Sequence, residues 1–134
     1  MLKLLYYTDK DPLNKPDLTE EQIREEVFEK LIKIVPRVGP KETAKSLISL
    51  RVVRGRPIGS NNEFENTQIS IEVFTPMTQW LIKDESLRPF KIMGEIKKSL
   101  KDKTINGMGK MTYTGYDLNF LTDEISAYEM SFNI

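Results

Sequence analysis

Two pairs of adjacent carboxylates come closest, by residue type and spacing, to a reactive site in this sequence. They are Asp84 with Glu85 and Asp123 with Glu124. Paired carboxylates can hold a divalent cation or exchange protons with a substrate. Each pair falls in a predicted turn, and the sequence offers no second acidic cluster at a spacing that would complete a site. We therefore interpret both pairs as charges of solvated loops.

Cysteine and histidine are both absent from the 134 residues. Their absence removes disulfides, thiol nucleophiles, the usual zinc ligands and the one side chain that ordinarily titrates near neutral pH. Gly107 and Gly109 lack the third glycine and the preceding strand of a phosphate-binding fingerprint, so this stretch predicts a turn. We therefore predict that the protein is not an enzyme and holds no metal or cofactor.

Charge and composition limit the partners. Twenty basic and twenty acidic residues cancel, so no overall field attracts nucleic acid or an anionic membrane, and we expect neither as a specific partner. A hydrophobic share of 39% against 30% charged predicts one soluble domain over residues 1–134. The sequence has no apolar run near the roughly 18 residues that span a bilayer and no signal-peptide pattern, so we expect a cytosolic protein.

One cluster of cations stands out. Arg51, Arg54 and Arg56 run off a predicted strand into the polar segment 54–63, which is far longer than the roughly two to five residues of a usual hairpin loop. The arginines could be solvated and paired with Glu63 or Glu65. Alternatively, the segment is a projecting interface arm that is mobile in the free protein and orders on a neighbouring subunit. The candidate interface residues are Arg51, Arg54, Arg56, Ile58, Asn61, Asn62 and Glu63.

Alternating stretches at 47–53 and 67–74 predict the two strands that carry this segment, each with one wet face. Before them, Thr19 and Gln22 have the spacing of a capping box. An apolar stripe at helical period predicts that the helix continues to Pro36. The stripe consists of Ile23, Val27, Leu31 and Ile34.

A second amphipathic helix is predicted over 86–100, with Ser86 as its possible cap and Pro89 in its first turn. Strands at 110–116 and 125–134 follow, linked by 117–124, while 2–7 is either a short strand or the lead-in to the first helix. We predict an α+β fold of order (β)αββαββ: a mainly antiparallel sheet of four to five strands with two amphipathic helices packed on one face.

This succession resembles the tail terminator, or tail completion, proteins of long-tailed bacteriophages. The similar pieces are "ISLRVVRGRP" and "ISIEVFTP" around an extended loop, then "RPFKIMGEIKKSL", then "GMGKMTYTGYDLNFLTDEISAYEMSFNI". The resemblance implies a homo-oligomeric ring, commonly sixfold, at the head-proximal end of the tail tube. Such a ring stops tube polymerisation and joins the tail tube protein to a neck or head-completion protein. It is part of the virion and assembles in the host cytoplasm.

Two other functions stay open at this point. The order of elements also fits a ferredoxin-like domain that binds RNA or a small ligand on its open sheet face. The predicted outer strand faces, however, carry polar residues and no aromatic pair placed to stack bases. These residues are Ser49, Arg51, Ser70, Glu72, Thr112 and Glu129. A small enzyme without histidine or cysteine ranks last.

Overall fold

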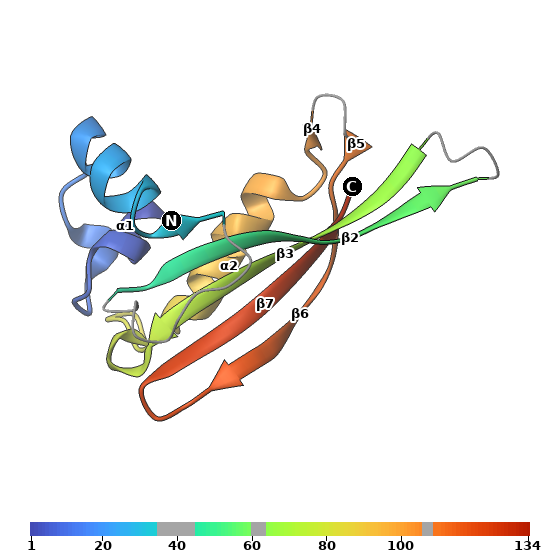
Figure 1. Ribbon diagram of the computed structural model, residues 1–134. Helices are drawn as coiled ribbons and strands as arrows, with labels where there is room; N and C mark the ends of the chain where they lie inside the picture. Colours follow the sequence, from blue (N-terminus) through green and yellow to red (C-terminus); the bar gives the residue numbers. More distant parts are fainter. Residues whose placement is uncertain (35–44, 60–63, 106–108) are drawn as a thin grey trace.

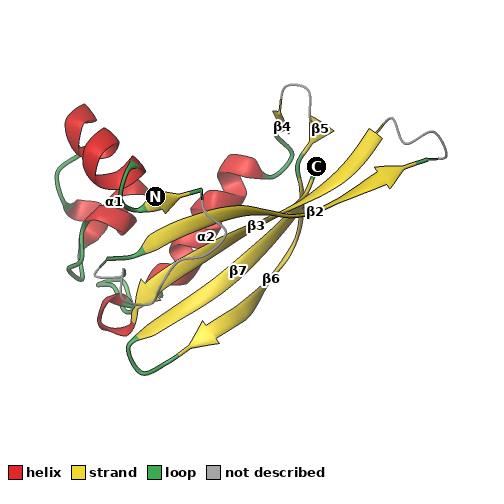
Figure 2. Ribbon diagram, viewed as in Figure 1, coloured by secondary structure: helices red, strands yellow, loops and turns green. Residues whose placement is uncertain are grey.

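The structure is a computed structural model that describes residues 1–34, 45–59, 64–105 and 109–134 (Figure 1). Strands make up a larger part of the described chain than helices do, with short helical segments near the N-terminus and one longer helix in the middle (Figure 2). The elements are α1 (Leu2–Tyr6), η1 (Pro12–Asn14), η2 (Gln22–Phe28), β1 (Ile32–Lys33), β2 (Leu47–Ile58), β3 (Phe64–Pro76), η4 (Met77–Gln79), α2 (Arg88–Leu100), β4 (Thr104–Ile105), β5 (Gly109–Lys110), β6 (Thr112–Leu121) and β7 (Ile125–Asn133).

Five strands form the main sheet, in the order β1-β2-β3-β7-β6. The short β1 runs parallel to β2, and every other neighbouring pair is antiparallel. The chain leaves β3, passes through α2 and returns to β6, so that β7 lies between two strands that run in the same direction. The predicted α+β fold with a mainly antiparallel sheet is confirmed.

The core lies between the sheet and α2, which crosses behind it in Figure 1. Ile92, Met93 and Ile96 are buried on this helix. They belong to the same core cluster as the buried apolar residues that alternate along β3 and β7. These strand residues are Ile69, Ile71, Val73, Met130 and Phe132. The period of two in β3 and β7 and the helical spacing in α2 are thereby confirmed. In β2, by contrast, Val52 of the predicted apolar face is 66% exposed.

The first helix begins as predicted and ends early. The Thr19 amide donates to Gln22 Oε1 at 2.9 Å and the Gln22 amide donates to Thr19 Oγ1 at 3.2 Å, which completes the capping box. The prediction that this helix continues to Pro36 is wrong. It ends at Phe28, and β1 pairs with β2 instead. Val27 is buried as expected, whereas Ile34 is 81% exposed.

A buried arginine fastens the N-terminal segment to the start of α2. Residues 2–6 form a helix rather than a strand. Arg88 is fully buried, and its guanidinium donates hydrogen bonds of 2.6–2.8 Å to four backbone carbonyl oxygens. The carbonyls belong to Leu4, Tyr7, Asp9 and Gln79. Burial lowers the pKa of Arg88, and the charge of Asp9 opposes that shift.

The start of α2 differs from the expectation in its cap. Pro89 lies in the first turn as predicted, but the N-cap is Leu87 and not Ser86. The Ser86 hydroxyl and amide instead donate to Asp84 in the preceding turn. Because the hydroxyl is already engaged there, it does not cap the helix.

Candidate functional site

The segment 54–63, predicted as a loop, is in large part a continuation of the two strands. β2 extends to Ile58 and β3 begins at Phe64, with Arg54 opposite Gln68 and Arg56 opposite Asn66. The expected ten-residue flexible loop is therefore wrong for residues 54–58. Asn61, Asn62 and Glu63 lie outside the described residues. Proline has no backbone N–H to donate to a neighbouring strand, so in sheets it is found on edge strands. Pro57 is compatible with this part of β2, which has no described neighbour on its outer side.

The two strands project beyond the rest of the sheet. β7 pairs with β3 only as far as Gln68, and backbone bonds between Thr67 and Ile134 close that end. Past this point only β2 and β3 remain, as a two-stranded ribbon that stands clear of the body (Figure 1). We call this ribbon, together with Arg54 and Thr67 at its base, the β-arm; it comprises residues 54–58 and 64–67.

A β-bulge places all three arginines on one face of the sheet. The pairing steps from Val52 opposite Ile69 to Arg54 opposite Gln68, which leaves Val53 as the extra residue. In a regular strand, Arg51 and Arg54 would point to opposite faces, because their spacing is odd. The bulge removes this difference, so Arg54 and Arg56 share the face of Arg51.

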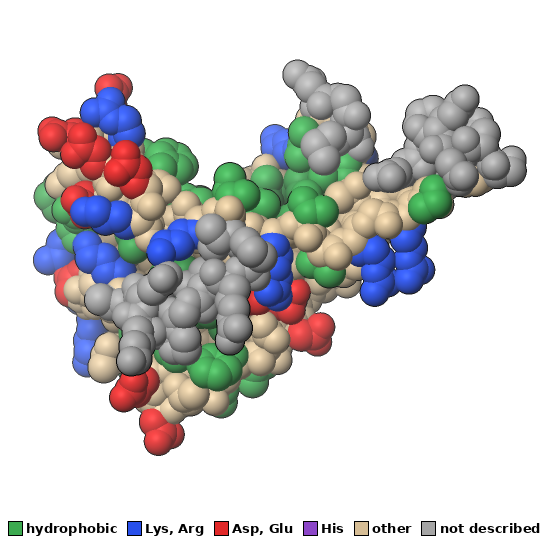
Figure 3. Space-filling view, in the orientation of Figure 1, with side chains coloured by type: hydrophobic (Ala, Val, Ile, Leu, Met, Phe, Trp, Pro, Cys, Tyr) green, Lys and Arg blue, Asp and Glu red, His purple; other side chains and the backbone are tan. Residues whose placement is uncertain are grey.

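Arg54 and Arg56 form the accessible part of this row. Both are exposed, and within the described part of the chain no hydrogen bond or ion pair engages their side chains. A shallow polar groove of about 160 Å³ is lined by Arg54, Arg56, Asn66, Gln68 and Asn133. Figure 3 shows basic side chains gathered on one side of the β-arm. The guanidinium groups of Arg54 and Arg56 are therefore positively charged hydrogen-bond donors that no described residue of the same subunit engages.

Arg51 is engaged within its own subunit. Its guanidinium forms ion pairs with Glu72 and with Glu129, the latter at 3.3 Å. Asn119 Nδ2 donates to Glu72 at 3.0 Å, and the Ser70 hydroxyl donates to Glu129. Among the candidate interface residues whose side chains the structure describes, Arg54 and Arg56 line the β-arm groove and Arg51 does not.

This network corrects the expectation of a wet outer face. Ser49, Ser70 and Glu72 are buried, with Glu72 only 7% exposed. Burial raises the pKa of Glu72, while the charge of Arg51 lowers it and that of Glu129 raises it further. Alternation alone assigned these positions to solvent. The pairing that brings them together depends on strand order, which no local pattern encodes.

The other lateral edge of the sheet is β6, and sequence analysis did not identify it as a surface of interest. Residues 117–121, predicted as part of a link, continue this strand. Its exposed large apolar side chains are Tyr116, Leu118, Phe120 and Leu121, which are 40–56% exposed. Tyr116 also packs edge-on against Phe90 of α2, with ring centroids 6.0 Å apart. The pairing of β6 with β7 shifts register between Leu118 and Phe120, so Phe120 lies on the opposite face of the sheet from the other three. Exposed apolar side chains on an edge strand are a feature of association surfaces.

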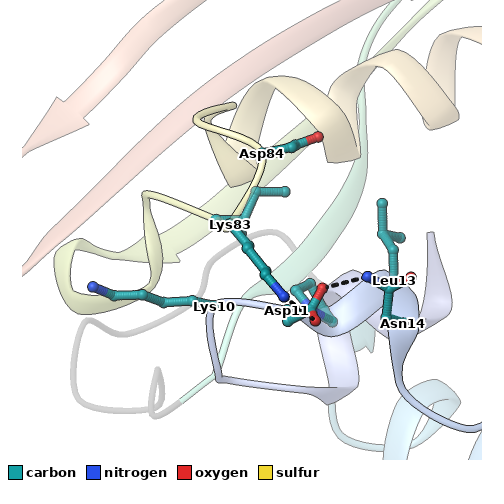
Figure 4. Close-up of a pocket in the computed structure, with 8 residues that line it drawn as sticks. Lys10, Asp11, Leu13, Asn14, Lys83 and Asp84 are labelled. Carbon is teal, nitrogen blue, oxygen red and sulfur yellow. Dashed lines mark hydrogen bonds and ion pairs between the residues drawn. The ribbon is translucent and has the colours of Figure 1, made fainter.

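Asp84, from the first of the two carboxylate pairs, is engaged by neighbouring side chains. Asp84 accepts hydrogen bonds from Lys91, at 2.6 Å, and from Ser86, which together lower its pKa to about 2. It lines a pocket of about 260 Å³ in which Lys83 and Asn14 both contact Asp11 (Figure 4). In the part of the chain that the structure describes, His, Cys, Asp and Glu form no group of three or more suited to a metal. Among the same residues, no helix is long and apolar enough to cross a membrane.

Comparison with protein-family models matches the whole chain, residues 1–134, to the family named YomW, so the chain belongs to the YomW family. A comparison with curated proteins found no match.

Proposed function

We propose that this protein is a structural subunit that joins copies of itself head to tail into a ring, as the tail terminator proteins that its sequence resembles do. The ring closes the head-proximal end of a phage tail tube, stops tube growth and offers a surface to a neck or head-completion protein. The observation that carries this proposal is the β-arm, which projects from the sheet with Arg54 and Arg56 exposed on one face.

The β-arm contributes little to the fold of its own subunit. An isolated two-stranded ribbon is marginally stable in water, because it buries little apolar surface. Residues 54–57 and Asn66 are all exposed, so the arm is not part of the core. Ordered strands that stand clear of the core gain their contacts from another molecule. An arginine guanidinium with free donors suits a carboxylate or a carbonyl-rich surface on that molecule.

A ring of identical subunits requires a heterologous interface, in which one patch meets a different patch on the next copy. The β-arm supplies one such patch at one end of the molecule. Sixfold symmetry, the tail tube partner and the place in the virion come from the resemblance. The described residues show the β-arm and the five-stranded sheet from which it projects.

The alternative of an RNA-binding ferredoxin-like domain has one feature in its favour, the exposed ring pair of Phe90 and Tyr116. Stacking platforms for nucleic acid, however, combine aromatic rings with basic residues that bind phosphate. Residues 112–134 contain four acidic residues and no lysine or arginine. The nearby Lys97 of α2 lies over the Tyr113 ring, 4.5 Å from its centroid, and so is already engaged within the subunit. The absence of basic residues in β6 and β7 therefore favours a protein partner.

The experiment compares wild-type protein with R54A/R56A and with K101A/K103A, a control that removes two exposed charges elsewhere. Each protein is added to polymerising tail tube protein from the same phage, and tube lengths are measured by negative-stain microscopy. Wild type and the control should give short, capped tubes, while R54A/R56A should leave tubes uncapped with its melting temperature unchanged. Uncontrolled tube growth with wild-type protein would refute the terminator role.

A further inference from the structure

The main sheet has two lateral edges, and both are unpaired over long stretches of the described chain. On one side, β1 covers β2 only at Ile48 and Ser49, so the outer edge of β2 from Leu50 onward has no described partner strand. On the other side, β6 pairs with β7 alone. Unpaired strand edges present rows of backbone donors and acceptors that can bind another strand.

Each edge also exposes apolar side chains. Val52 and Val53 are 66% and 48% exposed on β2. The β6 edge exposes Tyr116, Leu118, Phe120 and Leu121, of which Phe120 lies on the opposite face from the other three. Two edges that combine unpaired backbone with apolar side chains can bury both features at once by pairing with each other.

The charges of the two edges are opposite. The β2 edge carries Arg54 and Arg56, which no described residue engages. The hairpin formed by β6 and β7, residues 112–134, has no basic residue, and Asp117 is exposed in the middle of β6. Pairing β6 with β6, or β2 with β2, would oppose like charges. Pairing β6 with the β2 of another copy opposes unlike charges, so the head-to-tail contact is favoured.

Strand direction is consistent with the same contact. The pairs β2–β3, β3–β7 and β7–β6 are all antiparallel, so β2 and β6 of one subunit run in opposite directions. In a ring whose axis runs roughly along the strands, every copy keeps the same strand direction. The β6 of one copy then meets the β2 of the next in antiparallel orientation, and the alternation of the sheet continues across the boundary.

We propose that the β6 edge is the receiving surface for the β2 edge and β-arm of a second copy of this chain, and that the two strands pair antiparallel into a sheet continuous between subunits. This inference rests on the head-to-tail assembly in the proposed function and names the second half of its interface. Arg54 shares a face with Gln68, and through the ladder with Asn133 and Thr112, while Asp117 shares it with Glu129. A register with Arg54 opposite Asp117 therefore keeps both on one face.

Cysteine cross-linking tests this contact directly, because the chain has no cysteine of its own. In the register with Arg54 opposite Asp117, Gly55 of one copy lies opposite Tyr116 of the next, on the other face of the sheet. G55C and Y116C proteins are first checked for an unchanged melting temperature. Each is then oxidised alone, and the two are oxidised as a mixture. The same samples are treated with a short bis-maleimide, which can also link the two cysteines in neighbouring registers. K98C, on the exposed side of α2, replaces Y116C in the control mixture.

A covalent dimer that forms only in the G55C and Y116C mixture is the expected result. Dimers of G55C alone or Y116C alone would show like edges in contact and overturn the inference. Rings without any G55C–Y116C product would overturn it while leaving the ring function in place. Absence of self-association at every concentration, and also on tail tubes, would overturn the proposed function itself.

Charge reversal supplies an independent readout of the same contact. R54E/R56E and D117K should each weaken assembly at least about tenfold, because every interface then opposes like charges. Mixed in equal amounts, the two variants can alternate around the ring with every interface complementary, and assembly should return to within about threefold of wild type. A mixture that assembles no better than its components would contradict edge-to-edge pairing.

Discussion

At the scale of single residues, Arg88 is the side chain on which the N-terminal third depends most. Its guanidinium donates hydrogen bonds to four carbonyl oxygens, which come from α1, from the residues just after α1 and from the segment before α2. No other side chain can present so many directed donors without an acceptor of its own. Sequence analysis did not identify this role, because the stretch around Arg88 has the pattern of an ordinary helix start. The burial of the Arg88 side chain depends on residues about 80 positions earlier in the chain.

We expect Arg88→Met to lower the free energy of unfolding by about 3 kcal/mol or more, since it leaves buried carbonyls without donors. Arg88→Lys should cost less, about 2 kcal/mol, because the ammonium keeps its charge but cannot reach all four acceptors. Urea unfolding measures both, with Arg24→Met as an exposed control. A loss below about 1 kcal/mol for Arg88→Met would contradict this role.

Glu72 is a buried carboxylate whose raised pKa contributes to the pH dependence of stability. Burial raises its folded-state pKa above the 4.5 of a solvated glutamate, so the folded protein loses stability as the pH rises from that value through the raised pKa. Glu72→Gln keeps the shape and cannot ionise. We expect the stability of Glu72→Gln relative to wild type to increase over this rise in pH and then to level off.

Thermal or urea unfolding at a series of pH values from about 4 upward gives this difference directly. Glu20→Gln, which removes an exposed carboxylate from the helix start, is the control for loss of a surface charge. A difference between Glu72→Gln and wild type that stays constant over the whole series would show that Glu72 is not held in an unfavourable charged state.

At the scale of elements, local signals predicted the structures that local forces determine. The capping box at Thr19 and the alternation in β3 and β7 are set by near neighbours, and both were predicted. The early end of η2 was missed because Ile32 and Lys33 pair with β2, a contact that no helical period reveals. Likewise, Gly55 and Pro57 indicated a loop, but the ladder between β2 and β3 overrides that preference.

The bulge at Val53 is the element that aims the β-arm, and two variants separate its shape from its charges. Deleting Val53 should keep Arg54 opposite Gln68 and therefore keep assembly, because only the extra residue is lost. Arg54→Gln with Thr67→Arg moves one charge to the other face and should weaken assembly roughly tenfold, since a charged hydrogen bond contributes about 1.5 kcal/mol. Sedimentation over a concentration series compares them. Equal assembly by the charge-moved variant and wild type would show that the face of the arm is irrelevant.

At the scale of the whole molecule, a net charge of zero conceals two different edges. Composition predicted that no overall field acts, but it could not show that Arg54 and Arg56 lie on one edge and the base-free hairpin 112–134 on the other. The order of strands separates the two edges, because β3 and β7 lie between β2 and β6 in the sheet. The sequence alone singled out Arg54 and Arg56 as candidates. The β6 edge became apparent only from the order of the strands in the sheet.

Because unlike charges join the two edges in this account, assembly should weaken with salt. At about 1 M ionic strength the screening length falls to about 3 Å, so exposed pairs lose most of their attraction. We expect a lower assembled fraction in 1 M than in 0.1 M sodium chloride, and a smaller salt effect for R54A/R56A, measured by light scattering. Salt-strengthened assembly would instead indicate a contact dominated by apolar burial.

The most direct test of head-to-tail assembly is the shape of the oligomer formed by the unmodified protein. Mass photometry over a concentration series, followed by negative-stain class averages of the largest species, gives both the number of copies and the symmetry. The account predicts closed rings of a single size with rotational symmetry, formed at high concentration or on tube ends. A two-fold dimer that never closes into a ring, or a monomer under all of these conditions, would contradict it.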